Sequence, residues 1–242
     1  MTNQNDSGYG LKEDWVSIQK TLEEIIPVYD KTNRYISLGS DLRIRKRGIA
    51  LLKEHVGKDD FLLLDLGSGT GKMTSLFVQD SGKVEDAVLV DPIRGMMQVA
   101  KSRTRADGVL AVYEQLPFRG ASLDAAMAGF SLRDARDLTR ALEELHSTLK
   151  AGGHFLIVDL SKPSSKTKST LISFYWRAIA PVLAFIASGR SGLKFAALAT
   201  TYDRLPKVPD LVKLFEKIGF SVPVAEFSML GGACIIILRK NS

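Results

Sequence analysis

Three glycines at alternate positions follow an apolar run in the stretch LLLDLGSGTGKMT, residues 62–74. A glycine has no Cβ, so this stretch suits a tight turn to which a ligand can approach closely. The leucines before Asp65 are typical of a strand buried on both faces, and the residues after Gly71 favour a helix. The glycines would then lie at a strand-to-helix turn, where free backbone N–H groups favour binding of a small polar ligand.

The spacing of the glycines distinguishes between possible ligands. A phosphate-binding P-loop needs Ser or Thr after its lysine, but Met73 follows Lys72, and the dinucleotide pattern needs glycine where Lys72 stands. The sequence instead has D-x-G-x-G-x-G, starting at Asp65, which is the pattern of class I S-adenosylmethionine-dependent methyltransferases. We therefore predict S-adenosyl-L-methionine as cofactor, held at its methionine and ribose part by the loop residues Gly67, Ser68, Gly69, Thr70 and Gly71.

Two acidic residues end the first two predicted strands. Asp91 would accept hydrogen bonds from both ribose hydroxyls, or alternatively cap the helix that follows. Asp65 would contact either the methionine end of the cofactor or only the backbone of the loop. Pro92 and Met96, at the start of the next predicted helix, are expected to complete this side of the cofactor site.

The elements that must position these residues alternate between strands and helices. We predict strands at 61–66, 86–91, 109–114, 122–130, 154–160, 222–230 and 233–240, and helices at 71–80, 92–105, 137–150 and 208–220. This order predicts an α/β fold with a Rossmann-like, doubly wound seven-stranded sheet. The sheet is mostly parallel and contains one antiparallel strand from a C-terminal hairpin, with N-terminal helices and a helical lid beside it.

We expect one domain of ordinary size from the 242 residues. Residues 1–10 are polar and predict a disordered tail. The domain, 11–242, divides into N-terminal helices (11–56), a cofactor-binding core (57–162), a helical lid (163–205) and a C-terminal helix with two strands (206–242).

The composition limits the location and the partners. One cysteine, Cys234, excludes an intramolecular disulfide and fits a cytoplasmic protein. The three histidines show no metal-ligand spacing, so we expect no metal. The net charge is +6, partly clustered at 41–48 and 161–168, but no nucleic-acid-binding motif accompanies it. We expect no nucleic-acid partner.

The apolar stretch 172–189 lies in the predicted lid. Arg177 and Pro181 interrupt it, so we predict a lid or interfacial helix rather than a membrane span. Its apolar residues would line a channel for an isoprenoid tail: Phe174, Tyr175, Trp176, Leu183 and Phe185. Together with the basic residues before it, this stretch predicts peripheral contact with a membrane. Formation of a homodimer is left open.

Several further motifs resemble the ubiquinone/menaquinone biosynthesis C-methyltransferase family, between about residues 28 and 240. They are YDKTNRYISLG (29–39), LDLGSGTG (64–71), EQLPF (114–118), FSLRD (130–134), LKAGG (149–153) and DLSKP (159–163). The family usually has F-G-L-R-N where this chain has Ser131 and Asp134. It often has Asp or Asn, a partner for adenine, where this chain has Val112.

The resemblance implies roles for further residues. Arg133 would stabilise a phenolate and Asp134 would position or accept a proton from a water molecule; the alternatives are a structural ion pair and a helix cap. Tyr29 and Asn33 would close over the cofactor, with Tyr29 otherwise a core aromatic residue. Tyr113 and Glu114 complete the predicted cofactor site.

The sequence thus predicts a methyltransferase, and the resemblance implies a prenylated quinol, a menaquinone or ubiquinone precursor, as its substrate. Three other interpretations are a methyltransferase for another small molecule or lipid, a non-catalytic module that binds the cofactor, and an NAD-dependent oxidoreductase. Lys72 disfavours the last of these.

Overall fold

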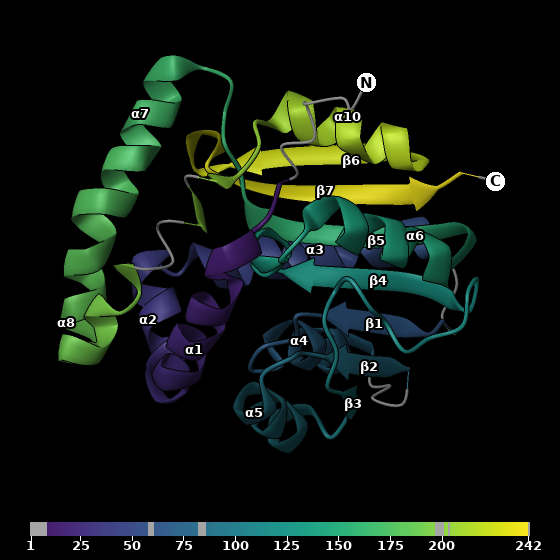
Figure 1. Ribbon diagram of the computed structural model, residues 1–242, viewed down its shortest axis with the longest axis horizontal. Helices are drawn as coiled ribbons and strands as arrows, with labels where there is room; N and C mark the ends of the chain where they lie inside the picture. The colour runs from purple at the N-terminus through teal and green to yellow at the C-terminus, as the bar shows by residue number, and fades with distance from the viewer. Residues whose placement is uncertain (1–8, 58–60, 82–85, 197–200, 203, 242) are drawn as a thin grey trace.

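A seven-stranded sheet with the order β3-β2-β1-β4-β5-β7-β6 forms the centre of the computed structural model (Figure 1). The structure describes residues 9–57, 61–81, 86–196, 201–202 and 204–241. The strands are β1 (Leu63–Leu66), β2 (Ala87–Val90), β3 (Asp107–Val109), β4 (Leu123–Gly129), β5 (Leu149–Leu160), β6 (Phe220–Ser228) and β7 (Ala233–Lys240).

Strand β7 is antiparallel to both of its neighbours, β5 and β6, and the other pairs are parallel. The strand order reverses between β1 and β4. From β1 the sheet continues to β2, and from β4 it continues to β5 in the opposite direction. Loops leaving the carboxyl ends of two such strands diverge to opposite faces, which opens a crevice for ligands. The predicted sheet, with its one antiparallel strand, is confirmed.

Helices cover both faces of the sheet. On one face lie α3 (Ser40–Val56), α4 (Lys72–Ser81) and α5 (Arg94–Thr104). On the other lie α6 (Leu138–Thr148) and α10 (Val208–Ile218). The central strands are buried on both sides, as in β1, where all four residues are buried. This burial explains the unbroken apolar run in the sequence.

A helical layer lies beside the sheet (Figure 1). It begins with η1 (Lys12–Asp14), α1 (Trp15–Ile25), η2 (Ile26–Val28) and α2 (Tyr29–Ile36). A long rod formed by α7 (Lys166–Phe174), the π-helix η4 (Tyr175–Ile179) and α8 (Ala180–Leu193) packs on this group. We call this rod the lid helix. The short helices η3 (Leu132–Asp134) and η5 (Met229–Gly231) follow β4 and β6.

The structure differs from the prediction in the third strand. The predicted strand at 109–114 is wrong, because β3 ends at Val109 and Val112 forms only an isolated bridge to Gln115. Residues 112–114 instead form a loop that lines the site. The predicted tail overlaps the described part only at Tyr9 and Gly10; the Tyr9 carbonyl accepts a hydrogen bond from Leu138.

Candidate active site

The loop between β1 and α4 uses its three glycines in different ways. Gly67 has φ +60°, and a Cβ there would lie 2.6 Å from the hydroxyl of Tyr113. Gly69 has φ +53°, and a Cβ there would meet no atom within 4 Å. At Gly71 a Cβ would touch α5 at Ala100. Gly69 therefore faces open space where a ligand would lie, whereas Gly67 and Gly71 allow close packing of the protein itself.

Asp91 is tied to this loop. One carboxylate oxygen accepts a hydrogen bond from Gly69 N–H (2.8 Å) and the other from Ile93 N–H (2.8 Å). It is not a helix cap, because α5 has Ile93 at its N-cap position. Burial raises the pKa of Asp91 to about 6, and the two backbone hydrogen bonds oppose this shift. The carboxylate is thus fixed in place with lone pairs left for another donor.

Asp65 lies at the end of β1 and is fully buried. One of its oxygens accepts from the backbone N–H (3.1 Å) and the hydroxyl (2.6 Å) of Thr74, which fixes the first turn of α4. Its other oxygen has no hydrogen-bond partner within the described residues. Burial raises the pKa of Asp65 to about 6, although the Thr74 hydrogen bonds lower it.

The N-terminal helices close over the glycine loop. Asp30 accepts a hydrogen bond from the Thr70 hydroxyl (2.8 Å) and pairs with Arg103 on α5 (2.5 Å). Tyr29 and Asn33, on the same helix as Asp30, reach the space above the loop. Sequence reasoning did not assign a role to Asp30, which holds α2 onto the loop.

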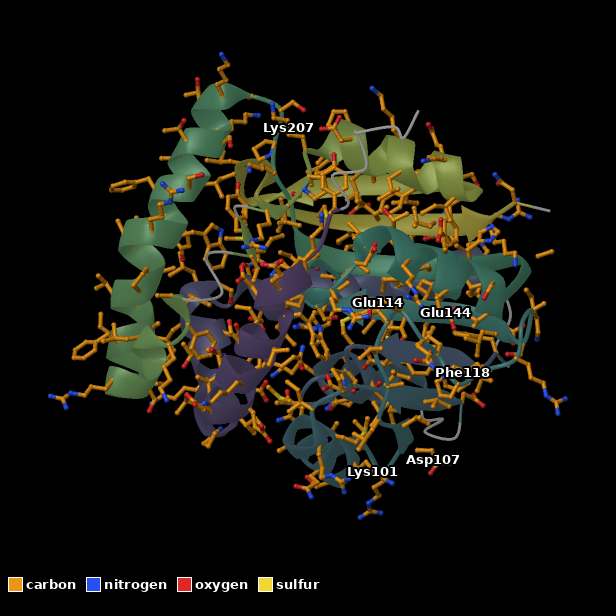
Figure 2. The ribbon with its side chains drawn as sticks, in the orientation of Figure 1. Lys101, Asp107, Glu114, Phe118, Glu144 and Lys207 are labelled. Carbon is orange, nitrogen blue, oxygen red and sulfur yellow. The ribbon has the colours of Figure 1, made fainter. Side chains whose placement is uncertain are left out.

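The segment 112–118 forms another wall of the site. The Tyr113 hydroxyl donates to the Leu66 carbonyl (2.7 Å) and lies 2.8 Å from the Ser131 hydroxyl. Glu114 accepts from the Asp137 N–H (2.8 Å), and Glu144 on α6 accepts from the Leu116 N–H (2.9 Å). Figure 2 labels both glutamates, which lie over α6 and the neighbouring strands in that view. They fix the segment that the D-x-G-x-G-x-G loop faces.

These walls enclose a cleft of about 830 Å³, including its open mouth. Most of the predicted site residues line it: Tyr29, Asn33, Gly67, Ser68, Gly69, Thr70, Asp91, Pro92, Met96, Tyr113, Glu114 and Asp134. Asp65, Gly71 and Arg133 do not line this cleft. A second cavity meets it at Asn33, Asp41, Arg45 and Phe130, and Arg133 lines that second cavity.

A buried charged corner lies where the two cavities meet. Arg133 donates hydrogen bonds to the Asp159 carboxylate (2.5 Å) and to the Phe130 carbonyl (2.7 Å). An oxygen of Asp134 lies 3.8 Å from the Nε atom of Arg133. Burial favours a lower pKa for Arg133, but the carboxylates of Asp134 and Asp159 outweigh it and raise the pKa. Arg133 therefore stays a cation, and Asp159, which sequence reasoning missed, is its main partner.

Asp134 is not a helix cap, since α6 is capped by the side chain of Asp137. One Asp134 oxygen is buried with no hydrogen-bond partner in the described part of the chain. Burial raises the pKa of Asp134 to about 6, opposed by the nearby cation of Arg133. Tyr29 belongs to the same corner: burial raises the pKa of its hydroxyl, and the charges of Arg133 and Asp134 act on it in opposite directions.

Arg45 on α3 is the main site residue that the sequence reasoning missed. It is only 8% exposed, lines both cavities, and lies over the ring of Phe130 at 4.7 Å. In the sequence, Arg45 belongs to the basic cluster 41–48. A signal was present: Arg45 shares the buried face of α3 with Gly48, Ile49 and Leu52, at helical spacing.

Within the part of the chain that the structure describes, no group of three His, Cys, Asp or Glu residues is placed to hold a metal ion. His55 and His154 do meet edge to face, 6.2 Å apart, although their sequence spacing gave no sign of it. Cys234 is buried, as expected of a small apolar residue.

The site has the features expected for S-adenosylmethionine. Four polar atoms on the cavity walls are buried without a hydrogen-bond partner in the described chain: Ser68 Oγ, Asp134 Oδ1, Arg45 Nε and Gln19 Oε1. Buried polar groups are normally hydrogen-bonded, so such atoms indicate ligand contacts. Together with the open space at Gly69 and the anchored carboxylate of Asp91, they match a ligand with an amino-acid end and a ribose.

This sheet order and glycine turn define a class I S-adenosylmethionine-dependent methyltransferase. Residues 9–239 match the model of the ubiE/COQ5 methyltransferase family, and the chain therefore belongs to this family. The predicted family and enzyme class are confirmed.

Individual relatives agree with this assignment. The chain is 29% identical to the demethylmenaquinone methyltransferase of Thermus thermophilus, over 82% of this chain and 90% of that one. It is 30% identical to the 2-phytyl-1,4-naphtoquinone methyltransferase of Nostoc punctiforme, over 92% and 98%. The fold resembles the Burkholderia thailandensis 1,6-didemethyltoxoflavin-N1-methyltransferase, solved with bound S-adenosylhomocysteine (TM-score 0.55, 17% identity, 90% and 88% covered).

Replacing Asp30 with alanine is expected to weaken cofactor binding by about tenfold without unfolding the protein. The change removes the acceptor of the Thr70 hydroxyl and the partner of Arg103, so α2 is no longer tied to the loop. Calorimetric titration with S-adenosylhomocysteine measures the effect. Asp14→Ala, which removes an ion pair with Arg204 elsewhere, is the control and should bind normally. Equal affinity of both variants would contradict the role of Asp30.

Proposed function

We propose that this protein transfers a methyl group from S-adenosylmethionine to a ring carbon of a quinol that carries an isoprenoid tail. The names of the relatives, which act on a demethylmenaquinone and on a phytyl naphthoquinone, support an acceptor of this class. A cytoplasmic location, expected from the single cysteine, is part of the same proposal.

The observation that carries the proposal is the joining of two unlike cavities at the charged corner. The cleft beside the glycine loop is lined by polar and apolar groups, and the second cavity is lined mainly by apolar ones such as Ile36, Ile44 and Trp176. Arg45 and Phe130 lie on the shared wall. A flat ring bearing hydroxyls would occupy the junction, with its apolar substituent in the second cavity.

The chemistry at the junction requires a nucleophilic ring carbon. When bound, the cofactor supplies an electrophilic methyl group on a sulfonium. A quinol hydroxyl becomes a better electron donor to its ring when its proton leaves, and Asp134 would take this proton directly or through a water molecule. The ring carbon would take the methyl group as the carbon–sulfur bond breaks, with S-adenosylhomocysteine as the leaving group. That carbon would then lose its hydrogen as a proton to solvent, which restores the aromatic ring.

Two cations would stabilise the resulting phenolate. Arg133 is held rigidly by Asp159 and the Phe130 carbonyl, and Arg45 presents its unpartnered Nε in the same region. Fixed charges in a site that excludes water stabilise developing negative charge strongly. Tyr29 would close the site from above, and its raised pKa keeps the hydroxyl protonated and able to donate.

The test uses the purified protein with S-adenosylmethionine and a demethylated naphthoquinone carrying a short prenyl tail, with and without prior reduction. We expect S-adenosylhomocysteine to form only with the reduced quinol, because the oxidised ring is a poor nucleophile. Asp159→Asn, which removes the charge that orients Arg133, should lower kcat by about tenfold or more. Methylation of other lipids, together with no methylation of quinols, would refute the proposed acceptor.

A further inference from the structure

We propose that the outer face of the lid helix binds an anionic lipid bilayer, and that a groove beside it admits the isoprenoid tail from that bilayer. The statement about the tail rests on the proposed function, whereas the membrane-binding face does not depend on it.

The lid helix carries an exposed apolar stripe along its length. Before the helix kinks at Ser188 and Gly189, the exposed positions follow helical spacing through the π-helix: Leu171, Phe174, Ile179, Val182, Phe185 and Ile186. Phe185 and Ile186 are 51% and 65% exposed. The rod lies at the edge of the molecule, with one side turned away from the sheet (Figure 1). A contiguous apolar face of this kind indicates an interaction surface.

The opposite side of the lid helix is packed on the protein. Ala180 and Ala184 are buried in one cluster with α1 and Phe195, and the Tyr175 hydroxyl donates to the Ile36 carbonyl (2.5 Å). By length and composition the helix Lys166–Leu193 could cross a membrane, with a mean hydropathy of 1.6 in its most apolar window. Its packed side and Arg177 and Arg190 favour a helix lying in the plane of the interface.

The charge of this region selects an anionic partner. Between Asp159 and Asp203 the sequence contains no Asp or Glu but has six basic residues: Lys162, Lys166, Lys168, Arg177, Arg190 and Lys194. The remaining 27 Lys and Arg equal the 27 Asp and Glu, so this segment carries the whole formal excess of +6. Of its six cations, Lys194 forms an ion pair with Glu24 on α1 (2.7 Å). Lys207, labelled in Figure 2, adds a further cation opposite Lys162, with which it forms a β-bridge.

Basic residues of this kind near a bilayer each contribute about 1 kcal/mol of attraction to anionic lipid, which favours a membrane as the occupant. Two copies of the chain joined through this face would instead bring two acid-free cationic segments together. The apolar stripe and the charge therefore point to the same partner.

The groove beside the stripe connects with the active site. It lies between the lid helix and η5, and Leu171, Phe174, Ile179 and Leu230 line it. It shares Leu160, Trp176 and Met229 with the second cavity, which in turn meets the cofactor cleft. The sequence-based prediction of a channel is thus wrong for Leu183 and Phe185, which do not line the groove; Leu183 packs inward and Phe185 points outward.

The test compares full-length wild type with Phe185→Glu/Ile186→Glu in sedimentation with phosphatidylglycerol–phosphatidylcholine vesicles. Both side chains are exposed, so the double variant should fold, which circular dichroism checks. We expect its vesicle affinity to fall at least about tenfold, because two apolar side chains no longer enter the bilayer. Leu110→Glu, an exposed apolar residue after β3, is the matched control and should sediment like wild type. Wild type should bind vesicles of pure phosphatidylcholine more weakly than vesicles that contain phosphatidylglycerol.

Methyl transfer separates this inference from the proposed function. The double variant should turn over a quinol without a tail at the wild-type rate, and a long-tailed quinol in vesicles at about a tenth of it or less. Vesicle binding without any quinol methylation would refute the proposed function but would still support the membrane-binding face of the lid helix. Absence of vesicle binding in wild type, or a dimer that the double variant breaks, would overturn the inference.

Discussion

Replacing Asp91 with alanine is expected to weaken binding of S-adenosylmethionine and S-adenosylhomocysteine by about 100-fold or more. The carboxylate is held by Gly69 and Ile93 with lone pairs free for two ribose hydroxyls, and each charged hydrogen bond contributes about 1.5–3 kcal/mol. Calorimetric titration measures the change. Asp107→Ala is the control, since Asp107 is exposed in β3, at the outer surface in Figure 2. Unchanged affinity in Asp91→Ala would mean that the ribose is bound elsewhere.

Measuring the stability of the ligand-free protein shows whether a loss of cofactor binding in an Asp91 variant results from loss of folding. The pKa of Asp91 rises from 3.8 to about 6 on folding, so the folded state binds the proton more tightly than the unfolded state does. Asp91 therefore lowers stability progressively as pH rises from about 4 to 6, and this cost persists at neutral pH. Asp91→Asn should keep one backbone hydrogen bond and lose this dependence, so at pH 7 it should be no less stable than wild type in thermal unfolding.

Replacing Asp134 with alanine is expected to lower kcat by about 100-fold while leaving cofactor affinity nearly unchanged. In the proposed mechanism this residue accepts the quinol proton, and general-base catalysis typically contributes about 10²–10⁴-fold. The raised pKa of about 6 predicts that kcat/KM of the wild type increases with pH up to about 6 and then levels off, because the base acts only when ionised.

Asp134→Asn distinguishes proton acceptance from positioning of a water molecule. An amide can still orient water, and the related family usually has asparagine here, so this variant should keep measurable turnover. It cannot accept the proton at this pH, so the increase of kcat/KM near pH 6 should disappear. Persistence of that increase in Asp134→Asn would assign it to another group and remove the base role from Asp134.

The part of the site that could be predicted from sequence depends on local backbone geometry. The D-x-G-x-G-x-G pattern fixes a turn, and the apolar runs around it fix two buried parallel strands, so the places of Gly69 and Asp91 follow from a few neighbouring residues. Asp65 and Gly71 belong to the same pattern, but their contacts are with Thr74 and α5 rather than with the cavity. The pattern thus predicts the loop but does not separate ligand contacts from packing.

Contacts between distant segments could not be predicted in this way. Arg45 is far from the glycine loop in sequence, and its charge favoured a surface position until the packing of α3 on the sheet placed it at the cavity wall. The pairing of Arg133 with Asp159 likewise depends on the parallel register of β4 and β5. A buried cation is stable only with such partners, and one sequence does not reveal which ones meet.

The third strand shows the same limit. Residues 109–114 are apolar and β-branched enough to predict a strand, yet pairing with β2 stops at Val109. The following residues turn inward, where Tyr113 binds the Leu66 carbonyl and Glu114 the backbone of Asp137. Tertiary hydrogen bonds override the local preference at the edge of the site.

The most direct test of the account is to supply S-adenosylmethionine labelled with ¹³C in its methyl group together with a reduced, prenylated demethylnaphthoquinone. The labelled product is then identified by NMR. The account predicts the label as a methyl group on an aromatic ring carbon, formed together with S-adenosylhomocysteine and much reduced by Asp134→Ala. A labelled methoxy group, or tight cofactor binding with no labelled quinol under reducing conditions, would contradict it.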